Sequence, residues 1–249
     1  QHDLALPYDL EGHKVFVFVS MGIVLDTDNY ERPEDILRDA DIAMYRAKGQ
    51  GRGRYEIFDP TMLERVMTRL ELESDLRKAL EHQEFIVHYQ PILDMGTQRT
   101  VGFEALVRWQ HSTRGRILPA EFIPTAEETG LIVPIGYWVL NEACRQIGDW
   151  QAQFPMDPPL TINVNMSTRQ CAEKDLVQRI AGILQKNKLD ASCLKLELTE
   201  SLIVEDSDDT SAMLSKLREL PVQVQSDDCG GGRSPVGCLG KLTIDGLKC

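Results

Sequence analysis

The chain has 249 residues, of which 42% are hydrophobic and 27% are charged, and this composition is typical of a folded globular protein. Its formal net charge of −12 argues against a protein that coats nucleic acid, because phosphate binding needs a basic face. The same excess of acid is compatible with a site that binds divalent metal ions.

Cysteine spacing and apolar runs suggest the compartment. None of the six cysteines forms a C-x-x-C pair, so neither a zinc knuckle nor a dithiol redox site is expected. The longest apolar runs, at 15–19 and 131–140, fall well short of the roughly 20 residues that span a bilayer. No signal peptide is visible, and the chain does not begin with Met. We expect a cytoplasmic protein, with no membrane segment in this chain and with any anchor placed upstream in a longer parent.

The N-terminal part shows a strand–helix–strand pattern. Residues 15–25 predict a strand, residues 33–48 predict a helix that begins at Pro33, and residues 55–58 predict a short closing strand. A second helical pattern at 61–83 looks like a connecting helix. We therefore place a first domain at 1–60, the connecting helix at 61–83 and a second domain at 84–249.

Strands and helices alternate in the second domain. Strands are predicted at 85–93, 101–109, 160–167, 193–200, 222–228 and 243–249. Helices are predicted at 119–129, 134–152, 172–187, 208–220 and 235–241. This order predicts a parallel sheet with crossover helices, either open or closed into a barrel.

Polar residues recur on one face of four of these strands, because side chains alternate along a strand. The acids and the amide in the C-terminal parts of the strands are Glu104, Asn165, Glu197 and Asp227, and Asp228 follows directly. In a parallel barrel these strand ends line the active site. Carboxylates gathered there repel one another unless cations lie between them, and oxygen ligands favour Mg²⁺, Mn²⁺ or Ca²⁺. Two such ions can activate water and stabilise charge on a phosphoryl group.

A simpler explanation remains open at this point. An antiparallel sheet with one solvated face shows the same alternation, and a single acid is more often solvated or ion-paired than a metal ligand. The recurrence of acids at the ends of successive strands, with helices between them, favours the barrel.

Seven motifs in order resemble one family. They are HYQPILD (88–94), GFEALVRW (102–109), PAEFIPTAEETGLI (119–132), NVNMS (163–167), LELTES (196–201), SDD (226–228) and IDGLK (244–248). From about residue 70 onward the chain is similar to the EAL-type cyclic-di-GMP phosphodiesterases. This resemblance implies an α/β fold, a TIM-like (β/α)8 barrel, of which the chain carries about six of eight strands. It also implies metal-dependent hydrolysis of cyclic-di-GMP to linear pGpG, and a homodimer formed through this domain in the intact protein.

The resemblance assigns roles residue by residue. It implies a two-metal site for Mg²⁺ or Mn²⁺ with the ligands Glu104, Asn165, Glu197, Asp227 and Asp228. Lys248 matches a lysine that contacts the attacking water, so the implied catalytic residues are Glu104, Asp228 and Lys248. The implied substrate-binding residues are Gln90, Leu106 and Arg108, and Arg108 carries a planar guanidinium suited to phosphate. Glu200 matches a glutamate that anchors the loop after the paired aspartates.

The N-terminal segment resembles the last half of an α+β GGDEF (diguanylate cyclase) domain. VSMGI (19–23) and ADIAMYRAKGQGRGRY (40–55) carry the resemblance. Lys48 and Arg52 match positions that contact GTP phosphates, but the GG(D/E)EF turn is absent from this sequence. We therefore expect no cyclase activity, and we interpret the two cations as a solvated basic helix end.

Two departures from the family point to impaired catalysis. The chain has DDCGGGRSPV where the family usually has DDFGTGYSSL, so Cys229 replaces a large ring and three glycines make the loop harder to order. The chain also stops at Cys249, before the family's last two strands. The alternative hypothesis is a non-catalytic module that binds cyclic-di-GMP or another protein. An unrelated metal-dependent barrel hydrolase is disfavoured by the ordered motifs.

Overall fold

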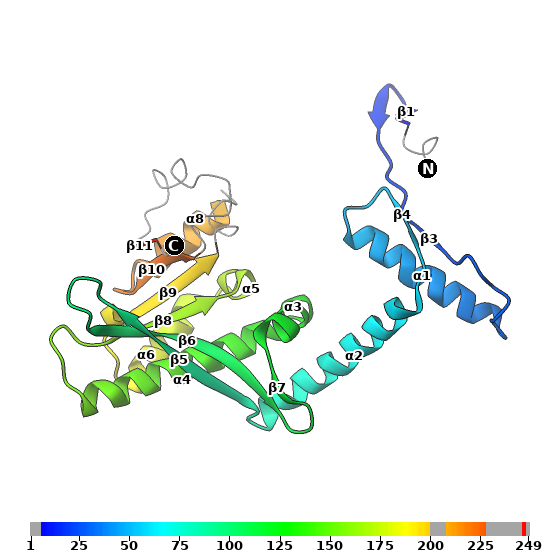
Figure 1. The fold of residues 1–249 in the computed structure, drawn as a ribbon. Helices are drawn as coiled ribbons and strands as arrows, with labels where there is room; N and C mark the ends of the chain where they lie inside the picture. Colours follow the sequence, from blue (N-terminus) through cyan, green and yellow to red (C-terminus); the bar gives the residue numbers. More distant parts are fainter. Residues whose placement is uncertain (1–5, 200–207, 228–245, 248–249) are drawn as a thin grey trace. The chain divides into compact units, whose positions relative to one another are not determined.

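The computed structural model describes residues 6–199, 208–227 and 246–247 (Figure 1). The chain forms two compact units, residues 1–72 and 73–249. The division falls inside the long helix α2 (Pro60–Glu81), which occupies the place of the predicted connecting helix. Within the described ranges, every helix is too short or too polar to cross a bilayer.

The first unit is a helix on short strands. Strands β1 (Tyr8–Leu10) and β2 (His13–Val15) form an antiparallel hairpin, and β3 (Met21–Ile23) pairs in parallel with β4 (Tyr55–Ile57). Helix α1 (Pro33–Gly49) packs so closely on β3 that a Cβ at Gly22 would collide with the Ala40 carbonyl oxygen. The single predicted strand at 15–25 was wrong, because residues 16–20 form no ladder between β2 and β3.

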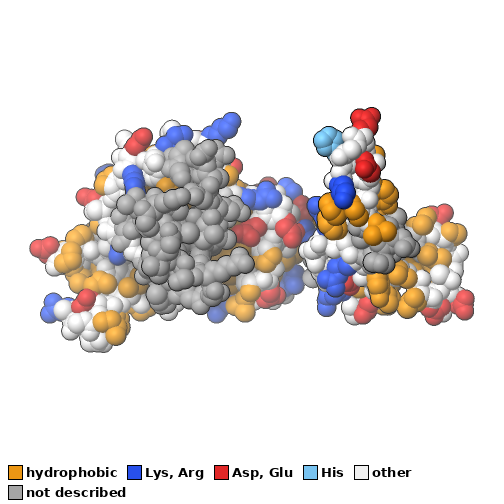
Figure 2. Space-filling model, turned by 90° about the horizontal axis from the view of Figure 1, so that it is seen from above, with side chains coloured by type: hydrophobic (Ala, Val, Ile, Leu, Met, Phe, Trp, Pro, Cys, Tyr) orange, Lys and Arg blue, Asp and Glu red, His pale blue; other side chains and the backbone are white. Residues whose placement is uncertain are grey.

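Hydrophobic side chains gather on the surface of this first unit (Figure 2). Phe18, Leu25 and Leu37 each expose 70% or more of their area. Between residues 6 and 59, the described hydrophobic residues that are buried are Ala43 and Ala47. The core of the described part of this unit is therefore small.

The second unit contains a twisted sheet in the order β11-β10-β9-β8-β6-β5. The strands are β5 (Phe85–Leu93), β6 (Thr100–His111), β8 (Thr161–Met166), β9 (Leu194–Thr199), β10 (Gln223–Asp227) and β11 (Gly246–Leu247). A short strand, β7 (Gly115–Ile117), pairs with the end of β6. From β6 to β11 the strands run parallel, which confirms the predicted α/β barrel-type sheet.

Strand β5 departs from this pattern because it runs antiparallel to β6. The prediction of an all-parallel sheet was wrong at this edge. Only residues 94–99 separate the two strands, too few for a crossover, and the Asp94 carboxylate closes the turn by accepting the Thr97 amide at 2.7 Å. The six-residue gap was a visible signal for a hairpin.

Helices cover the sheet as crossover connections. They are α3 (Pro119–Thr129), α4 (Ile132–Gln153), α5 (Thr168–Cys171), α6 (Leu176–Asn187), the short 3₁₀ helix η2 (Ala191–Cys193) and α8 (Asp208–Leu217). Figure 1 shows α4 lying along the sheet, and it packs against β8 and α6. The predicted helix at 172–187 begins four residues later than predicted, at Leu176 of α6, and the short helix α5, which was not predicted, precedes it. The predicted helix at 235–241 lies outside the described residues.

The apolar face of the sheet forms the core. Strand register aligns its residues in rows, such as Phe103, Ile162 and Leu194, followed by Ala105, Val164, Leu196 and Val224. All of these except Phe103 are buried. Side chains two residues apart share a face, so this packing turns the intervening polar residues toward the opposite face.

Gly102 sets how closely β6 approaches β8. A Cβ at Gly102 would lie 2.6 Å from the Thr161 carbonyl oxygen and would also collide with the Thr161 hydroxyl. We expect Gly102→Ala to lower the free energy of unfolding by about 1–3 kcal/mol, because backbone atoms cannot move aside without shifting a strand. Urea unfolding measures the change. Gly182→Ala is the matched control, because a Cβ there meets nothing within 4 Å, and alanine in helix α6 should be neutral or stabilising. Equal stability of the Gly102→Ala variant and the wild type would contradict the close approach.

Candidate metal and ligand site

The polar face of the sheet carries the predicted site residues in rows. The first row, across β6, β8 and β9, contains Glu104, Asn163 and Lys195. The second row, nearer the C-terminal strand ends, contains Asn165, Glu197, Gln225 and Gly246. In the third row, Asp227 lies opposite Thr199 at the end of β10. Glu104, Asn165, Glu197 and Asp227 thus occupy positions of one face on neighbouring parallel strands.

Glu104 and Asn165 form a direct pair. The Asn165 Nδ2 donates a hydrogen bond of 2.9 Å to Glu104 Oε1. Glu104 is one row behind Asn165 in the register, so its longer side chain spans the distance of about two residues along the strand. Since the amide nitrogen is used by Glu104, the amide oxygen is the group that Asn165 offers to a ligand.

Glu197 belongs to a buried pair on the neighbouring strands. Its side chain is 1% exposed, and that of Asn163 is 4% exposed. The Asn163 Nδ2 donates to Glu197 Oε1 at 2.7 Å and to Gln225 Oε1 at 3.2 Å. A charge-assisted bond of this length holds the carboxylate in one orientation at the base of the site.

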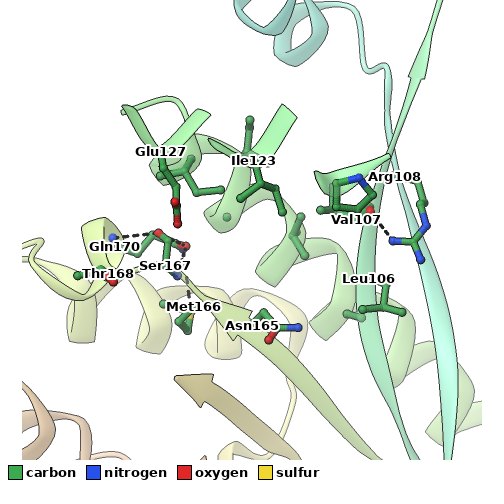
Figure 3. Close-up of a pocket in the computed structure, with 16 residues that line it drawn as sticks. Leu106, Val107, Arg108, Ile123, Glu127, Asn165, Met166, Ser167, Thr168 and Gln170 are labelled. Atoms are coloured by element: carbon green, nitrogen blue, oxygen red, sulfur yellow. Dashed lines mark hydrogen bonds between the residues drawn. The ribbon is translucent and has the colours of Figure 1, made fainter. Parts of the chain in front are cut away.

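A cavity of about 500 Å³ opens beside this face, between the ends of β6 and β8 and the helices α3 and α4 (Figure 3). Leu106, Arg108 and Asn165 line it, and so do Glu127 and Ser167. The guanidinium of Arg108 donates to the backbone oxygen of Val107 at 2.8 Å, which keeps the side chain at the rim. The structure thus brings three of the predicted residues together at one pocket.

Ser167 and Gln170 shape the far side of this cavity. The Ser167 hydroxyl caps the short helix α5 by accepting the Gln170 amide at 3.2 Å, and the Gln170 side chain accepts the Ser167 amide in return. Gln170 is 1% exposed and fills the space that Gly136 leaves on α4. This capping box begins directly after Met166, the last residue of β8, and so fixes the end of the strand that carries Asn165 into the pocket.

The other predicted residues are not all brought into this site. Gln90 lies opposite Glu104 in the β5–β6 register and is exposed, but it does not line the cavity. The backbone of Asp227 ends β10, whereas its side chain lies outside the described part of the structure, as do Glu200, Asp228, Lys248 and the altered loop after Asp228. In the first unit, Lys48 and Arg52 are exposed near the end of α1.

The donor set fits a hard divalent cation. Glu104 and Glu197 supply carboxylate oxygens and Asn165 supplies an amide oxygen, which are the ligand types of Mg²⁺ and Mn²⁺. Among the described residues no three acids, histidines or cysteines cluster closely enough to hold a metal by themselves. Within that part of the chain, Glu104 and Glu197 therefore do not form a complete metal site by themselves.

Family models match both parts of the chain. An EAL domain model matches residues 73–249, and a diguanylate cyclase GGDEF domain model matches residues 1–54. The chain belongs to the EAL domain family. The EAL match covers the sheet, its polar face and the cavity. The GGDEF match covers the first unit as far as the residue before β4.

Two curated relatives match nearly the whole chain. The chain is 39% identical over 245 residues to the bifunctional diguanylate cyclase/cyclic di-GMP phosphodiesterase MucR of Pseudomonas aeruginosa. It is 38% identical over 246 residues to the cyclic di-GMP phosphodiesterase PdeR of Escherichia coli. Each match covers 98% of this chain and 36% of the relative, so the chain spans about a third of the length of these proteins.

Solved structures show the same fold. The PaMucR phosphodiesterase in complex with c-di-GMP is 40% identical, with a TM-score of 0.66 over 71% of each chain. The EAL domain of Mycobacterium smegmatis DcpA is 32% identical, with a TM-score of 0.54 over 66% of this chain and 65% of that one. These neighbours confirm a TIM-like barrel architecture for the EAL unit, of which the sheet here shows six strands and the β7 addition.

Sequence reasoning missed two residues that support Glu197, the buried Asn163 and the half-buried Gln225. Both stand on the polar face by strand alternation, two residues before Asn165 and Asp227 respectively. An amide at an inward position of a barrel strand was therefore a usable signal. Its partner could not be predicted, because the register between β8, β9 and β10 is not encoded in any one strand.

Proposed function

We propose that the EAL unit binds cyclic-di-GMP and hydrolyses one of its phosphodiester bonds to give linear pGpG, with Mg²⁺ or Mn²⁺. The observation that carries the proposal is the arrangement of Glu104, Asn165 and Glu197 on one face of adjacent parallel strands, where Asn165 also lines the cavity. Family membership and the phosphodiesterase relatives MucR and PdeR support it.

Each of the proposed site residues has a role that suits the chemistry of its side chain. Glu104, Asn165, Glu197, Asp227 and Asp228 would hold the metal ions. When bound, two divalent ions supply an activated water and neutralise charge on the phosphoryl group. The carboxylates keep the site anionic, and the hydrogen bonds to Glu104 and Glu197 hold their oxygens in place before any ligand arrives.

Leu106 and Arg108 are placed to contact a bound substrate, because they line the cavity. Arg108 stands at its rim and would exchange its bond with the Val107 carbonyl for a phosphate oxygen, which its planar guanidinium fits well. Leu106 supplies an apolar wall, and Gln90 would reach the ligand from β5. At about 500 Å³ the cavity falls within the usual range of small-molecule sites, about 300–1,000 Å³. Lys248 would contact the attacking water, and Glu200 would anchor the loop after the aspartates.

Titration of this chain with cyclic-di-GMP, with and without Mg²⁺, tests the proposal. Formation of pGpG that requires Mg²⁺ is the expected result, at a rate below that of EAL domains with the usual DDFGTGYSSL loop if the altered loop at 229–235 impairs catalysis. Binding without turnover would favour a non-catalytic cyclic-di-GMP module instead. Absence of binding in both conditions would contradict both functions for this chain. No cyclase activity is proposed, because this sequence contains Lys48 and Arg52 but not the GG(D/E)EF turn.

A further inference from the structure

Asn163 and Gln225 form hydrogen bonds beneath Glu197, and the proposed metal ligands by themselves do not explain why these two amides are there. We infer that Asn163, assisted by Gln225, is a positioning residue that fixes the Glu197 carboxylate in the orientation needed for metal binding. This inference rests on the metal site of the proposed function. Asn163 itself would touch neither the metal nor the substrate.

The hydrogen bonds define which way the Asn163 amide points. Its Nδ2 carries two hydrogens, and the two acceptors are Glu197 Oε1 at 2.7 Å and Gln225 Oε1 at 3.2 Å. A reversed amide would place Oδ1 against a carboxylate oxygen, and the two would repel each other. The charge of Glu197 therefore sets the orientation of Asn163, and Asn163 in turn limits rotation of the carboxylate.

Asn163 also retains an unfavourable feature. Its Oδ1 is buried and has no hydrogen-bond partner in the described part of the structure. A buried acceptor without a partner destabilises the folded state. A side chain that served packing alone would gain nothing from this amide, so the contact with Glu197 is the feature that accounts for an asparagine here.

The position of Asn163 in the sheet suits a supporting role. It lies opposite Glu104 on β6 and opposite Lys195 on β9, one row behind Asn165 and Glu197. It is thus placed between the two strands that carry the acids, and deeper in the barrel than either expected metal ligand of the second row. Gln225 lies opposite Glu197 on β10, the strand that ends at Asp227, and accepts the second hydrogen bond from Asn163.

Mn²⁺ binding to the full chain, measured by calorimetry and by the electron paramagnetic resonance signal of free Mn²⁺, tests the inference without requiring turnover. We expect Asn163→Ala to raise the Mn²⁺ dissociation constant by about 10–100-fold, as loss of an outer-shell partner of a metal ligand commonly does. Gln225→Ala should raise it by less, since that residue acts on Glu197 through Asn163. Asn141→Ala is the matched control, because this asparagine lies on α4 and pairs with Asn187, away from the site.

A double-mutant cycle separates positioning from a general loss of structure. In a Glu197→Gln background, Asn163→Ala should change Mn²⁺ affinity by less than about twofold, because the carboxylate it positions is gone. Circular dichroism checks that each variant is folded, and if Asn163→Ala does not fold, Gln225→Ala carries the test. An equal loss of affinity in both backgrounds would overturn the inference.

The remaining outcomes distinguish this inference from the proposed function. Wild-type Mn²⁺ affinity in the Asn163→Ala variant would overturn the positioning role and leave the phosphodiesterase proposal standing. Mn²⁺ binding that depends on Asn163, in a chain that forms no pGpG, would support the positioning role and count against the phosphodiesterase. No Mn²⁺ binding by the wild-type chain would overturn both the inference and the metal site on which it rests.

Discussion

Replacing Glu104 by glutamine is expected to lower the rate of pGpG formation from cyclic-di-GMP by at least about 100-fold, since even outer-shell partners of metal ligands contribute about 10–100-fold. Glutamine keeps a side-chain oxygen that can accept the Asn165 amide, which donates to Glu104 Oε1 at 2.9 Å in the wild type. What the substitution removes is the negative charge. A lower rate of pGpG formation in this variant would therefore report on cation binding rather than on the position of Asn165.

The measurement compares pGpG formation by wild type and variant at saturating Mg²⁺ and again across a Mg²⁺ titration. Glu81→Gln is the matched control, because Glu81 is an exposed acid at the end of α2, and its rate should stay within about twofold of wild type, as is usual for surface substitutions. Glu104→Ala should be no more active than Glu104→Gln. A Glu104→Gln variant with wild-type turnover would exclude Glu104 as a metal ligand.

Replacing Trp109 by alanine is expected to reduce the free energy of unfolding of the EAL unit by about 3–5 kcal/mol, the usual range for removal of a large buried ring. Trp109 is fully buried at the end of β6. Its ring packs against Phe85 at 5.9 Å and edge-on against Phe122 at 5.7 Å between centroids. The cavity left behind would lie where β5, β6 and α3 meet.

Trp109 also has a polar partner that the variant would lose. Its Nε1 donates to Glu84 Oε2 at 3.0 Å, and this hydrogen bond is the main reason that the pKa of Glu84 is held below its usual range. The pKa of Glu84 should therefore rise in Trp109→Ala. Urea unfolding followed by far-UV circular dichroism measures the stability. Phe154→Ala is the control: the residue is 55% exposed, so this substitution should lower the free energy of unfolding far less. Equal losses of stability in the two variants would contradict the assigned core.

The sequence predicted most of the EAL unit because its patterns are local. Each strand from β5 to β11 except the short β7 was predicted, to within a few residues at its ends, from apolar residues at a period of two bounded by turn residues or helices. The same period placed Glu104, Asn165, Glu197 and Asp227 on the polar face. The prediction failed at β5, where the general βαβ rhythm was applied although residues 94–99 leave no room for a helix.

What the sequence by itself determined is the face on which each side chain stands, since the direction of a side chain along a strand is a property of that strand's backbone. Only the tertiary structure decided which residues meet: Glu104 with Asn165, and Asn163 with Glu197 and Gln225. Those pairs depend on the register between strands, and they join residues 34 to 62 apart in the chain, as Asn163–Glu197 and Asn163–Gln225 show. Register is set by the packing of several strands together, with β5, β6 and β8 against α4, so a pattern within one strand does not contain it.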